Sequence, residues 1–451
     1  MNYYNKLAGN ILLPISDRIT GWGVSKSLKF LRESQYWSET DLINYQTDKL
    51  KQLINHAFNN VPYYTDLFRK NGLTPADIQE IEDLRKIPTL TKELIMENFN
   101  NGRLLSRKLN KKKVLLKLSS GSTGQKTVYY IDNEAYGFNL ACNLRGWEWM
   151  GFEIGDSFIK VSQNKRNSKL KKIQDFLNHS YLFTKTYDEE GFDFFLQKII
   201  KYNIQYIRSY PDPLLFLSHF MKRKGIKLTK SIKGINTTGN TLYSDVRELI
   251  ESTFNTKIFD SYSCEGGPNY FECPTHSCYH SSMEYGISEI LNSRQEEVSL
   301  GERGRLITTD LWNYATPFIR YESKDIVIKS DTKCSCGRNL LNIKGIVGRD
   351  NDIIIAPNSK LFIGQSFTTY FKYFTEIEYF HVYQKSEYEF IFSLKVKPEL
   401  SSKTCKNIID DWENYLGKGS CVDIKIIDNI PLLPSGKRRF LSRDSSIKLK
   451  L

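Results

Sequence analysis

A short stretch rich in glycine and hydroxyl groups is the first place in this sequence where chemistry is expected. Its members are Ser119, Ser120, Gly121, Ser122, Thr123 and Gly124. Glycine lets the backbone approach a ligand closely, and amide and hydroxyl groups donate hydrogen bonds to phosphate oxygens. The stretch lacks the final Gly-Lys-Ser/Thr of a Walker A motif, and a strand-like run, 128–131, follows it where that motif has a helix. Two interpretations stay open, a phosphate-binding loop and an ordinary turn.

Cysteine and histidine side chains gather in two stretches of the second half. The first stretch holds Cys264, Cys273, His276, Cys278 and His280, and the second is Cys334-Ser335-Cys336-Gly337. Zinc takes four thiolate or imidazole ligands in a tetrahedral arrangement, often two from each of two loops, so these stretches predict a structural zinc. A catalytic zinc is disfavoured, because four protein ligands leave no open position. The alternatives are partly buried free thiols and a Cys–His nucleophilic pair.

Length and charge limit the classes of function. The chain has 451 residues, enough for roughly three domains, and a formal net charge of +13. That charge favours anionic partners such as nucleotides, coenzyme A or an acidic membrane surface. No nucleic-acid reading motif accompanies it, so nucleic acid is not an expected partner. The early apolar run 11–15 is far shorter than the roughly 20 residues of a spanning helix and lacks signal-peptide features, so a cytoplasmic protein is expected.

Helices are expected to dominate residues 1–110, ahead of the glycine-rich stretch. Between Asp41 and Asn59 apolar residues recur at near-helical spacing. Val61-Pro62 should end that helix, because a residue before proline disfavours helical geometry. Thr91 is the expected N-cap of a second helix.

An alternation of helices and short strands is expected from 111 to 348. Runs at 114–118, 128–131, 204–207, 234–236 and 257–259 have the composition of strands, and such alternation predicts a layered α/β core. Short β runs with glycine-containing turns should follow from 300 to 350. Residues 349–451 then read as a small α+β domain. The sequence does not indicate an oligomeric state.

In their order and spacing, these stretches resemble the adenylate-forming superfamily, in its phenylacetate–CoA ligase-like and capsule-biosynthesis (CapK-type) branch. The resemblance covers nearly the whole chain. It includes 61–64 and 87–92 in the helical region, the stretch 119–124 as the phosphate loop, and Thr238 and Gly239 in the segment lining the nucleotide pocket. Asn240 stands where the family often has a glutamate. The implied fold is α/β, a large layered adenylation domain with a small mobile α+β C-terminal domain.

The resemblance also implies roles for single residues. Glu265 resembles the glutamate that holds magnesium on the ATP phosphates, although the Tyr-Gly that the family places before it is altered here. Asp325 resembles the aspartate that grips the ribose hydroxyls, and Arg349 the arginine at the domain hinge. Lys437, in Pro-Ser-Gly-Lys, resembles the C-terminal lysine that reaches the acyl-phosphate centre. In this branch the zinc ligands match Cys273, His280, Cys334 and Cys336, with Cys278 and His276 as competitors.

The implied activity is ATP-dependent conversion of a carboxylic acid to an acyl-AMP with release of pyrophosphate, followed by transfer to coenzyme A. An amine or sugar acceptor in surface-polysaccharide biosynthesis is the alternative acceptor. Two further readings remain: a degenerate member that binds nucleotide without catalysis, and a zinc-stabilised binding module without catalysis. The sequence does not name the acid.

Overall fold

The computed structural model describes residues 3–118, 127–162, 179–183, 189–228, 231–349, 352–357, 360–371, 373–374, 376–397, 399–429 and 439–447. The whole glycine-rich stretch, 119–124, and Lys437 therefore lie outside the described residues, and so does the side chain of Arg349.

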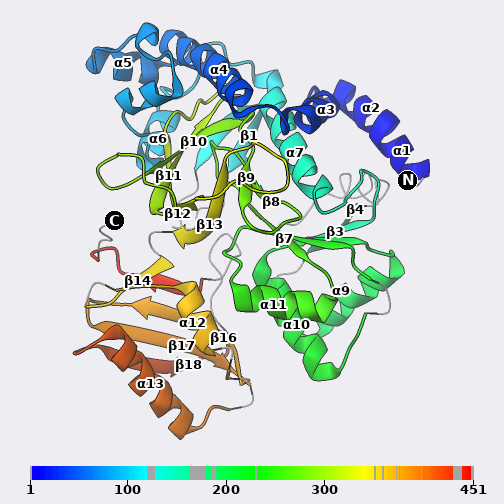
Figure 1. Ribbon diagram of the computed structural model, residues 1–451, viewed down its shortest axis with the longest axis vertical. Helices are drawn as coiled ribbons and strands as arrows, with labels where there is room; N and C mark the ends of the chain where they lie inside the picture. The colour runs from blue at the N-terminus through cyan, green and yellow to red at the C-terminus, as the bar shows by residue number, and fades with distance from the viewer. Residues whose placement is uncertain are drawn as a thin grey trace.

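Eleven of the described strands form one sheet through the large part of the molecule (Figure 1). Its order is β10 (Gly286–Leu291), β11 (Arg303–Asp310), β12 (Tyr321–Lys329), β13 (Asn342–Arg349), β9 (Tyr279–Ser281), β8 (Tyr270–Glu272), β7 (Ile258–Tyr262), β6 (Gly234–Thr238), β5 (Tyr206–Ser209), β3 (Phe158–Ser162) and β4 (His179–Phe183). Pairing is antiparallel from β10 to β7 and parallel from β7 to β4. The sheet therefore changes character at β7.

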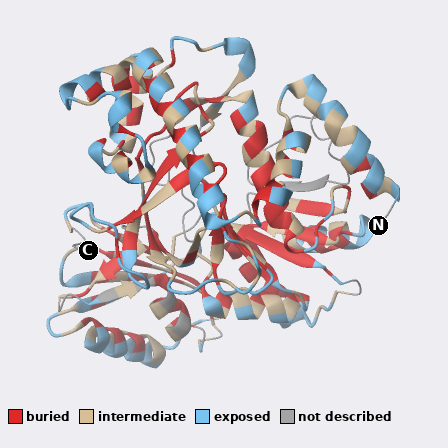
Figure 2. Ribbon diagram, turned by 45° about the horizontal axis from the view of Figure 1, so that its top comes forward, coloured by how far each residue is buried: buried red, intermediate tan, exposed pale blue. Residues whose placement is uncertain are grey.

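Helices α9 (Glu189–Lys201), α10 (Pro211–Lys224) and α11 (Ser244–Phe254) pack on the parallel strands. Side chains such as Leu214 and Ile250 from the helices join Ile207, Ile235 and Ile258 from the strands in one buried cluster. Such continuous burial is typical of parallel strands covered by helices. Figure 2 shows these strands as buried, with exposed residues on the outer helix faces.

The first third of the chain is mainly helical, as predicted. Its helices are α1 (Tyr3–Leu7), a π turn (Ala8–Leu12), α2 (Leu13–Thr20), α3 (Val24–Ser34), α4 (Glu39–Asn60), α5 (Pro62–Lys70), α6 (Lys92–Asn100) and α7 (Asn133–Glu148), with short 3₁₀ turns at 75–77, 81–86 and 111–113. Helix α4 ends at the predicted place, and Pro62 opens α5 because proline suits a first helical turn. Thr91 caps α6, where its hydroxyl accepts the Leu94 N–H at 3.3 Å.

An antiparallel hairpin, β1 (Val114–Leu118) and β2 (Val128–Asp132), flanks the glycine-rich stretch, and its register pairs Leu118 with Val128. The predicted strands at 204–207, 234–236 and 257–259 exist, with β5 beginning two residues late. The short runs predicted between 300 and 350 are wrong, because β11, β12 and β13 each have eight or nine residues. Glycine did not break them: Gly304 lies inside β11, where an added Cβ would fall 2.7 Å from Ile290. The glycine therefore marks close packing.

A second sheet lies beyond β13. The elements there are β14 (Ile353–Ile355), β15 (Leu361–Ile363), α12 (Gly364–Phe371), β16 (Ile377–Gln384), β17 (Glu389–Val396), α13 (Ser402–Leu416), β18 (Cys421–Ile426) and β19 (Leu441–Arg443). Four of these strands, in the order β18-β17-β16-β19, form a sheet separate from the large one. Trp412 of α13 stacks on Phe367 of α12 at 4.0 Å and centres this core.

The two parts touch along α10 and α11. Thr368 of α12 donates a hydrogen bond to Asp245 of α11 at 2.9 Å, and the rings of Phe216 and Tyr379 lie 5.5 Å apart. Gly364 of α12 lets the small part approach Tyr243 of the large part closely, since a Cβ added at Gly364 would fall 1.9 Å from the Tyr243 hydroxyl. The small part therefore rests against the helices that cover the parallel strands (Figure 1).

Candidate active site and cysteine cluster

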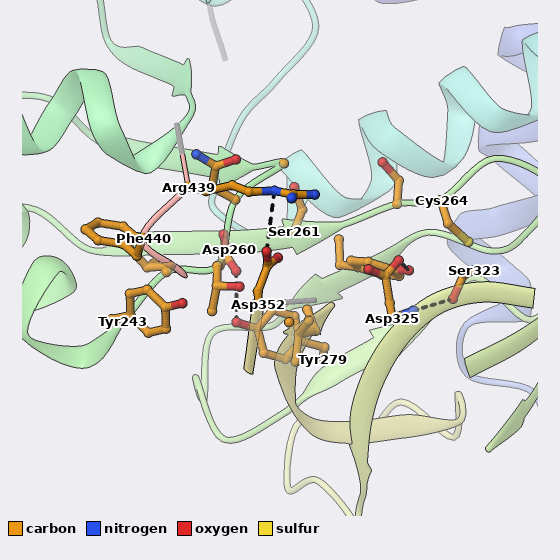
Figure 3. A pocket seen from close by; sticks show the side chains of 18 of the residues that line it. Tyr243, Asp260, Ser261, Cys264, Tyr279, Ser323, Asp325, Asp352, Arg439 and Phe440 are labelled. Carbon is orange, nitrogen blue, oxygen red and sulfur yellow. Dashed lines mark hydrogen bonds and ion pairs between the residues drawn. The ribbon is translucent and has the colours of Figure 1, made fainter. Parts of the chain in front are cut away.

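A cavity of about 170 Å³ opens at the carboxyl ends of β6 and β7. This is the edge of a parallel sheet where ligands bind in doubly wound α/β folds. Segments from both parts of the chain line it: 239–243 after β6, 260–265 along and after β7, residues of β12 and β13, and residues 352 and 439–441. Figure 3 shows side chains from these segments converging on the cavity.

Asp325, on β12, is held in the cavity wall by its neighbours. The Tyr262 hydroxyl donates to its carboxylate at 2.5 Å, and its backbone N–H donates to the Ser323 hydroxyl at 3.1 Å. Burial and the charge of Asp325 raise the pKa of Tyr262, so the phenol remains a donor at neutral pH. Tyr262, part of the altered motif, thus fixes the orientation of Asp325.

Asp260, on β7, is the centre of a buried polar network. Its carboxylate accepts hydrogen bonds from Thr237 at 2.5 Å and from Tyr279 at 2.9 Å, and its backbone N–H donates to Glu272 at 2.8 Å. Arg247 of α11 donates to the same Glu272 at 2.6 Å. Burial, together with the charge of Glu272, raises the pKa of Asp260 to about 7. The cavity floor therefore holds a carboxyl that titrates near neutral pH.

Glu265 is half-buried where the chain leaves β7. Burial lowers the pKa of Lys117, on β1, while the charge of Glu265 acts in the opposite direction. Beside Glu265, burial raises the pKa of the Cys264 thiol to about 12, so that thiol is protonated at neutral pH. Because thiolate is the nucleophilic form, this environment disfavours Cys264 as a nucleophile.

The last described segment brings the small part into the cavity. The Arg439 guanidinium pairs with the Asp352 carboxylate at 3.4 Å, and the Phe440 ring lies 5.5 Å from that of Tyr243 (Figure 3). Lys437 itself is outside the described residues, two positions before Arg439. Arg439, the first described residue after Lys437, therefore reaches the cavity.

Several residues singled out in the sequence meet at this cavity. Gly239, Glu265 and Asp325 line it, and Thr238 ends β6 one residue earlier. Arg349 lies opposite Asp325 in the register of β12 and β13. The glycine-rich residues 119–124 lie outside the described residues.

Sequence reasoning missed several lining residues, and four of them are Tyr243, Asp352, Arg439 and Phe440. Each lies within four positions of a residue that had been singled out. The available signal was therefore proximity to a motif.

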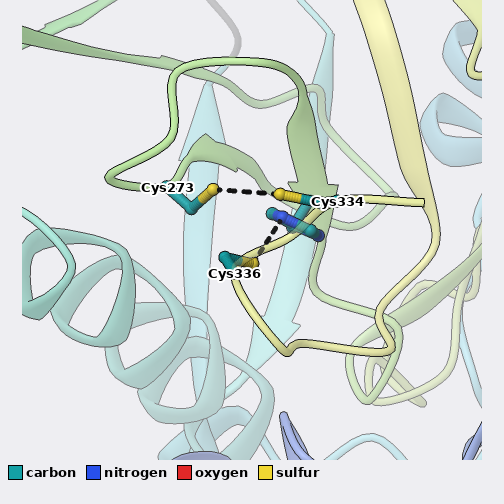
Figure 4. A group of neighbouring side chains, drawn as sticks. Cys273, Cys334 and Cys336 are labelled. Atoms are coloured by element: carbon teal, nitrogen blue, oxygen red, sulfur yellow. Dashed lines mark hydrogen bonds between the residues drawn. The ribbon is translucent and has the colours of Figure 1, made fainter. Parts of the chain in front are cut away.

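A compact group of three thiols and one imidazole lies at the predicted zinc site (Figure 4). Its members are Cys273, His280, Cys334 and Cys336. The Cys273 and Cys334 sulfurs are 3.5 Å apart, and the Cys336 sulfur is 3.3 Å from the His280 Nε2. With zinc–sulfur bonds of about 2.3 Å, tetrahedral geometry places sulfurs about 3.8 Å apart, so the set fits a zinc ion.

The chemistry of the donors agrees with that fit. Burial opposes ionisation of the Cys334 thiol, yet hydrogen bonds from Thr275, the Cys336 backbone and Ser277 lower its pKa to about 5. Burial lowers the pKa of His280, which favours the neutral imidazole. Thiolate and neutral imidazole are the forms that bind metal.

The two competitors lie beside the group. The ring of His276 is 3.5 Å from the Glu272 carboxylate, and the Cys278 sulfur is 3.7 Å from the His280 Nε2. Burial raises the pKa of Cys278 to about 12, so it stays a protonated thiol. The same protonation disfavours a Cys278–His280 nucleophilic pair.

Comparison with known proteins bears on the family. A family model described as the CapK C-terminal domain matches residues 354–444. Protein CapK of Staphylococcus aureus is 23% identical over 430 residues, which cover 92% of this chain and 91% of CapK. A phenylacetate-coenzyme A ligase of Pseudomonas putida is 24% identical over 403 residues, which cover 81% of this chain and 83% of the ligase.

Solved structures agree on the fold. The crystal structure of 2-hydroxyisobutyryl-CoA ligase in the postadenylation state, in complex with R3-HIB-AMP, gives a TM-score of 0.73 at 14% identity, covering 92% of this chain and 93% of that one. Over most of its length the chain is similar to adenylate-forming coenzyme A ligases, as predicted. The predicted α/β fold class is confirmed.

The same 2-hydroxyisobutyryl-CoA ligase in the thioesterification state gives a lower TM-score of 0.58, covering 91% of this chain and 93% of that one. Among the described residues, no helix combines the length and apolar character needed to cross a bilayer.

Proposed function

We propose that this chain uses ATP to activate a carboxylic acid as an acyl-AMP, releases pyrophosphate, and then transfers the acyl group to coenzyme A. The observation that carries the proposal is the cavity, where Glu265 and Asp325 of the large part meet Arg439 of the CapK-type part. Two of the similar proteins, the phenylacetate-coenzyme A ligase and the 2-hydroxyisobutyryl-CoA ligase, are named as coenzyme A ligases of organic acids, and this supports the reaction class.

In the first step, a carboxylate oxygen attacks the α-phosphorus of ATP and the bond to pyrophosphate breaks. Such a reaction depends mainly on positioning and on neutralising charge. We assign the stretch from Ser119 to Gly124 to the pyrophosphate, Gly239 and Thr238 to the nucleotide, and Asp325 to the ribose hydroxyls. Tyr262 supports the last assignment, because it fixes the Asp325 carboxylate.

We assign the charge-bearing roles to two residues. Lys437 stabilises the phosphate in the transition state, and its proximity along the chain to Arg439, a cavity residue, supports this role. Glu265 is the carboxylate for magnesium, a hard cation that prefers oxygen ligands and offsets phosphate charge.

The second step requires the small part to move. We propose that residues 349–451 form a domain that turns about Arg349, withdrawing Lys437 and admitting the acceptor. The separate sheet and separate buried core of the small part support a movable arrangement, because domains that have their own core commonly move relative to one another.

We also propose that Cys273, His280, Cys334 and Cys336 hold a structural zinc. Four protein ligands leave no position for a substrate, so its contribution is to join the loop after β8 to the loop before β13. Chelation that leaves both folding and activity unchanged would exclude this role.

An amine or sugar acceptor is the second candidate for the transfer step. The observation that favours it is that the small part matches the CapK C-terminal model and that CapK matches more of this chain than the phenylacetate–CoA ligase of Pseudomonas putida does. Product analysis separates the two acceptors once the acid is known.

Carboxylate-dependent ATP–pyrophosphate exchange tests the first step. Purified protein is supplied with aromatic, fatty, hydroxy and amino acids in turn, and Lys437→Ala is the matched variant. We expect exchange with one class of acid and a loss of about a hundredfold in the variant. ATP binding without exchange for any acid would favour a degenerate member, and absence of ATP binding would favour a binding module without catalysis.

A further inference from the structure

The helical segment 3–20 exposes a row of large apolar side chains. Their exposed fractions lie between 41% and 91%, and the row comprises Tyr3, Leu7, Ile11, Ile15 and Ile19. Single exposed apolar residues are common on protein surfaces, but a contiguous row marks an interaction surface. We call these five residues the apolar row.

Helix geometry keeps the apolar row on one face. Residues four apart overshoot a full α-helical turn, so a row with this spacing would wind slowly around a regular helix. The π turn at Ala8–Leu12, between α1 and α2, holds more residues per turn and offsets part of that drift. The row therefore stays together along the length of the segment, which is about 27 Å at 1.5 Å per residue.

The opposite face fixes the segment to the body of the protein. Asn5 is buried and donates to Glu153 at 3.2 Å and to Asp156 at 2.8 Å. Ala8 is also buried, and it packs closely against Gly155. A Cβ added at Gly155 would lie 3.2 Å from the Ala8 Cβ. The segment lies at the periphery in both ribbon views (Figures 1 and 2). Its apolar row thus faces outward from a fixed support.

The charges beside the row are mainly positive. Lys6 and Arg18 are exposed, and each directly precedes a member of the row. Further along, Lys26 and Lys29 are exposed on α3. The acidic residue of this segment, Asp17, accepts the N–H groups that open α3, at 2.8 and 2.6 Å. An apolar face flanked by lysine and arginine is typical of helices that lie in the interface of an anionic membrane.

We propose that segment 3–20 docks this protein on an anionic lipid surface, with the apolar row inserted among the acyl chains and Lys6 and Arg18 at the phosphate headgroups. A second copy of this chain is a poorer occupant, because pairing the rows would bring the flanking cations of two strongly basic chains together. The docked helix lies parallel to the membrane plane and does not cross it.

Vesicle sedimentation tests the docking. Full-length protein is mixed with vesicles of phosphatidylcholine alone or with about a third phosphatidylglycerol, and the bound fraction gives a partition coefficient. We expect binding to the anionic vesicles that weakens at high salt, because surface charge attraction is screened. Ile11→Ser with Ile15→Ser should lower the partition coefficient at least about tenfold. Lys6→Ser with Arg18→Ser should remove most of the preference for anionic lipid.

The matched control makes the same chemical change elsewhere. Ile200→Ser with Ile426→Ser alters isoleucines that are 48% and 52% exposed, close to the exposure of the paired residues in the row. This control should bind vesicles as the wild type does, and thermal unfolding checks that every variant is folded. Equal binding by the row variant and the control would overturn the proposal. Vesicle-independent self-association, lost in the row variant in sedimentation velocity, would overturn it in favour of a dimer contact.

Discussion

The cavity and the cysteine cluster are built in opposite ways. The cavity draws side chains from segments between 239 and 441, including two that belong to the small part. The cluster takes its four members from two loops of one sheet, 273–280 and 334–336. A site assembled from separate parts can open and close, whereas a closed set of four ligands holds its loops together. We therefore propose that the first region carries the chemistry and that the second stabilises the fold.

The two regions are nevertheless linked. Asp260 lines the cavity, and the Tyr279 side chain that binds it directly precedes His280 of the cluster. Glu272, which directly precedes Cys273, joins the same network through the Asp260 backbone and Arg247. A loss of order in the cluster should therefore reach the cavity through β8 and β9.

Removing a cluster thiol should have the largest effect on stability. We expect Cys334→Ser to lower the free energy of unfolding by at least about 3 kcal/mol, because the folded state loses a metal that it alone binds well. Chemical denaturation measures the change and elemental analysis measures bound zinc. Cys405→Ser, on α13, is the control and should keep both. If the two variants were equally stable, the cluster would not be a stabilising metal site.

Changing the cavity carboxylate should give the opposite pattern. We expect Glu265→Gln to slow ATP–pyrophosphate exchange about a hundredfold, or about 2.7 kcal/mol, while its melting temperature stays close to that of the wild type. Glu296→Gln, exposed on the surface, should change neither quantity. A large loss of stability without loss of exchange in Glu265→Gln would reverse the proposed division between the regions.

The hydrogen-bond network around Asp260, which links the two regions, should make the free energy of unfolding depend on pH. Burial raises the pKa of Asp260 to about 7, above the roughly 3.9 of an unfolded aspartate. Between these values the folded state holds the proton more tightly, so this residue makes stability fall as pH rises. Asp260→Asn removes that fall. We expect the wild type to lose on the order of 4 kcal/mol relative to the variant between pH 4 and pH 8, measured by denaturation. Parallel pH curves would contradict the raised pKa.

Local patterns in the sequence predicted local features well. The N-cap at Thr91, the end of α4 at Val61 and the hairpin around the glycine-rich stretch each depend on a few neighbouring residues. The four predicted cluster members also lie together in the structure, and the resemblance supplied their selection. Arg439 was missed because it reaches the cavity through the position of the small part against the large part, which the motif two residues before it does not specify. The length of the strands after 300 was underestimated because Gly304 lies inside β11, where it reflects packing against Ile290, whereas Gly301 lies in a turn as predicted.

The contact between the two parts should give the smallest effect. The Thr368 hydroxyl donates to Asp245 at 2.9 Å across this contact, beside the Gly364–Tyr243 approach that leads into the cavity. A hydrogen bond of this kind contributes about 1 kcal/mol, so Thr368→Val and Asp245→Ala should show a coupling of that size in a double-mutant cycle. The cycle uses the free energy of unfolding and the KM for ATP. Coupling in KM as well as in stability would mean that the contact holds the cavity together. Additive effects on both would mean that the small part takes its position from its other contacts, including the one between the Phe216 and Tyr379 rings.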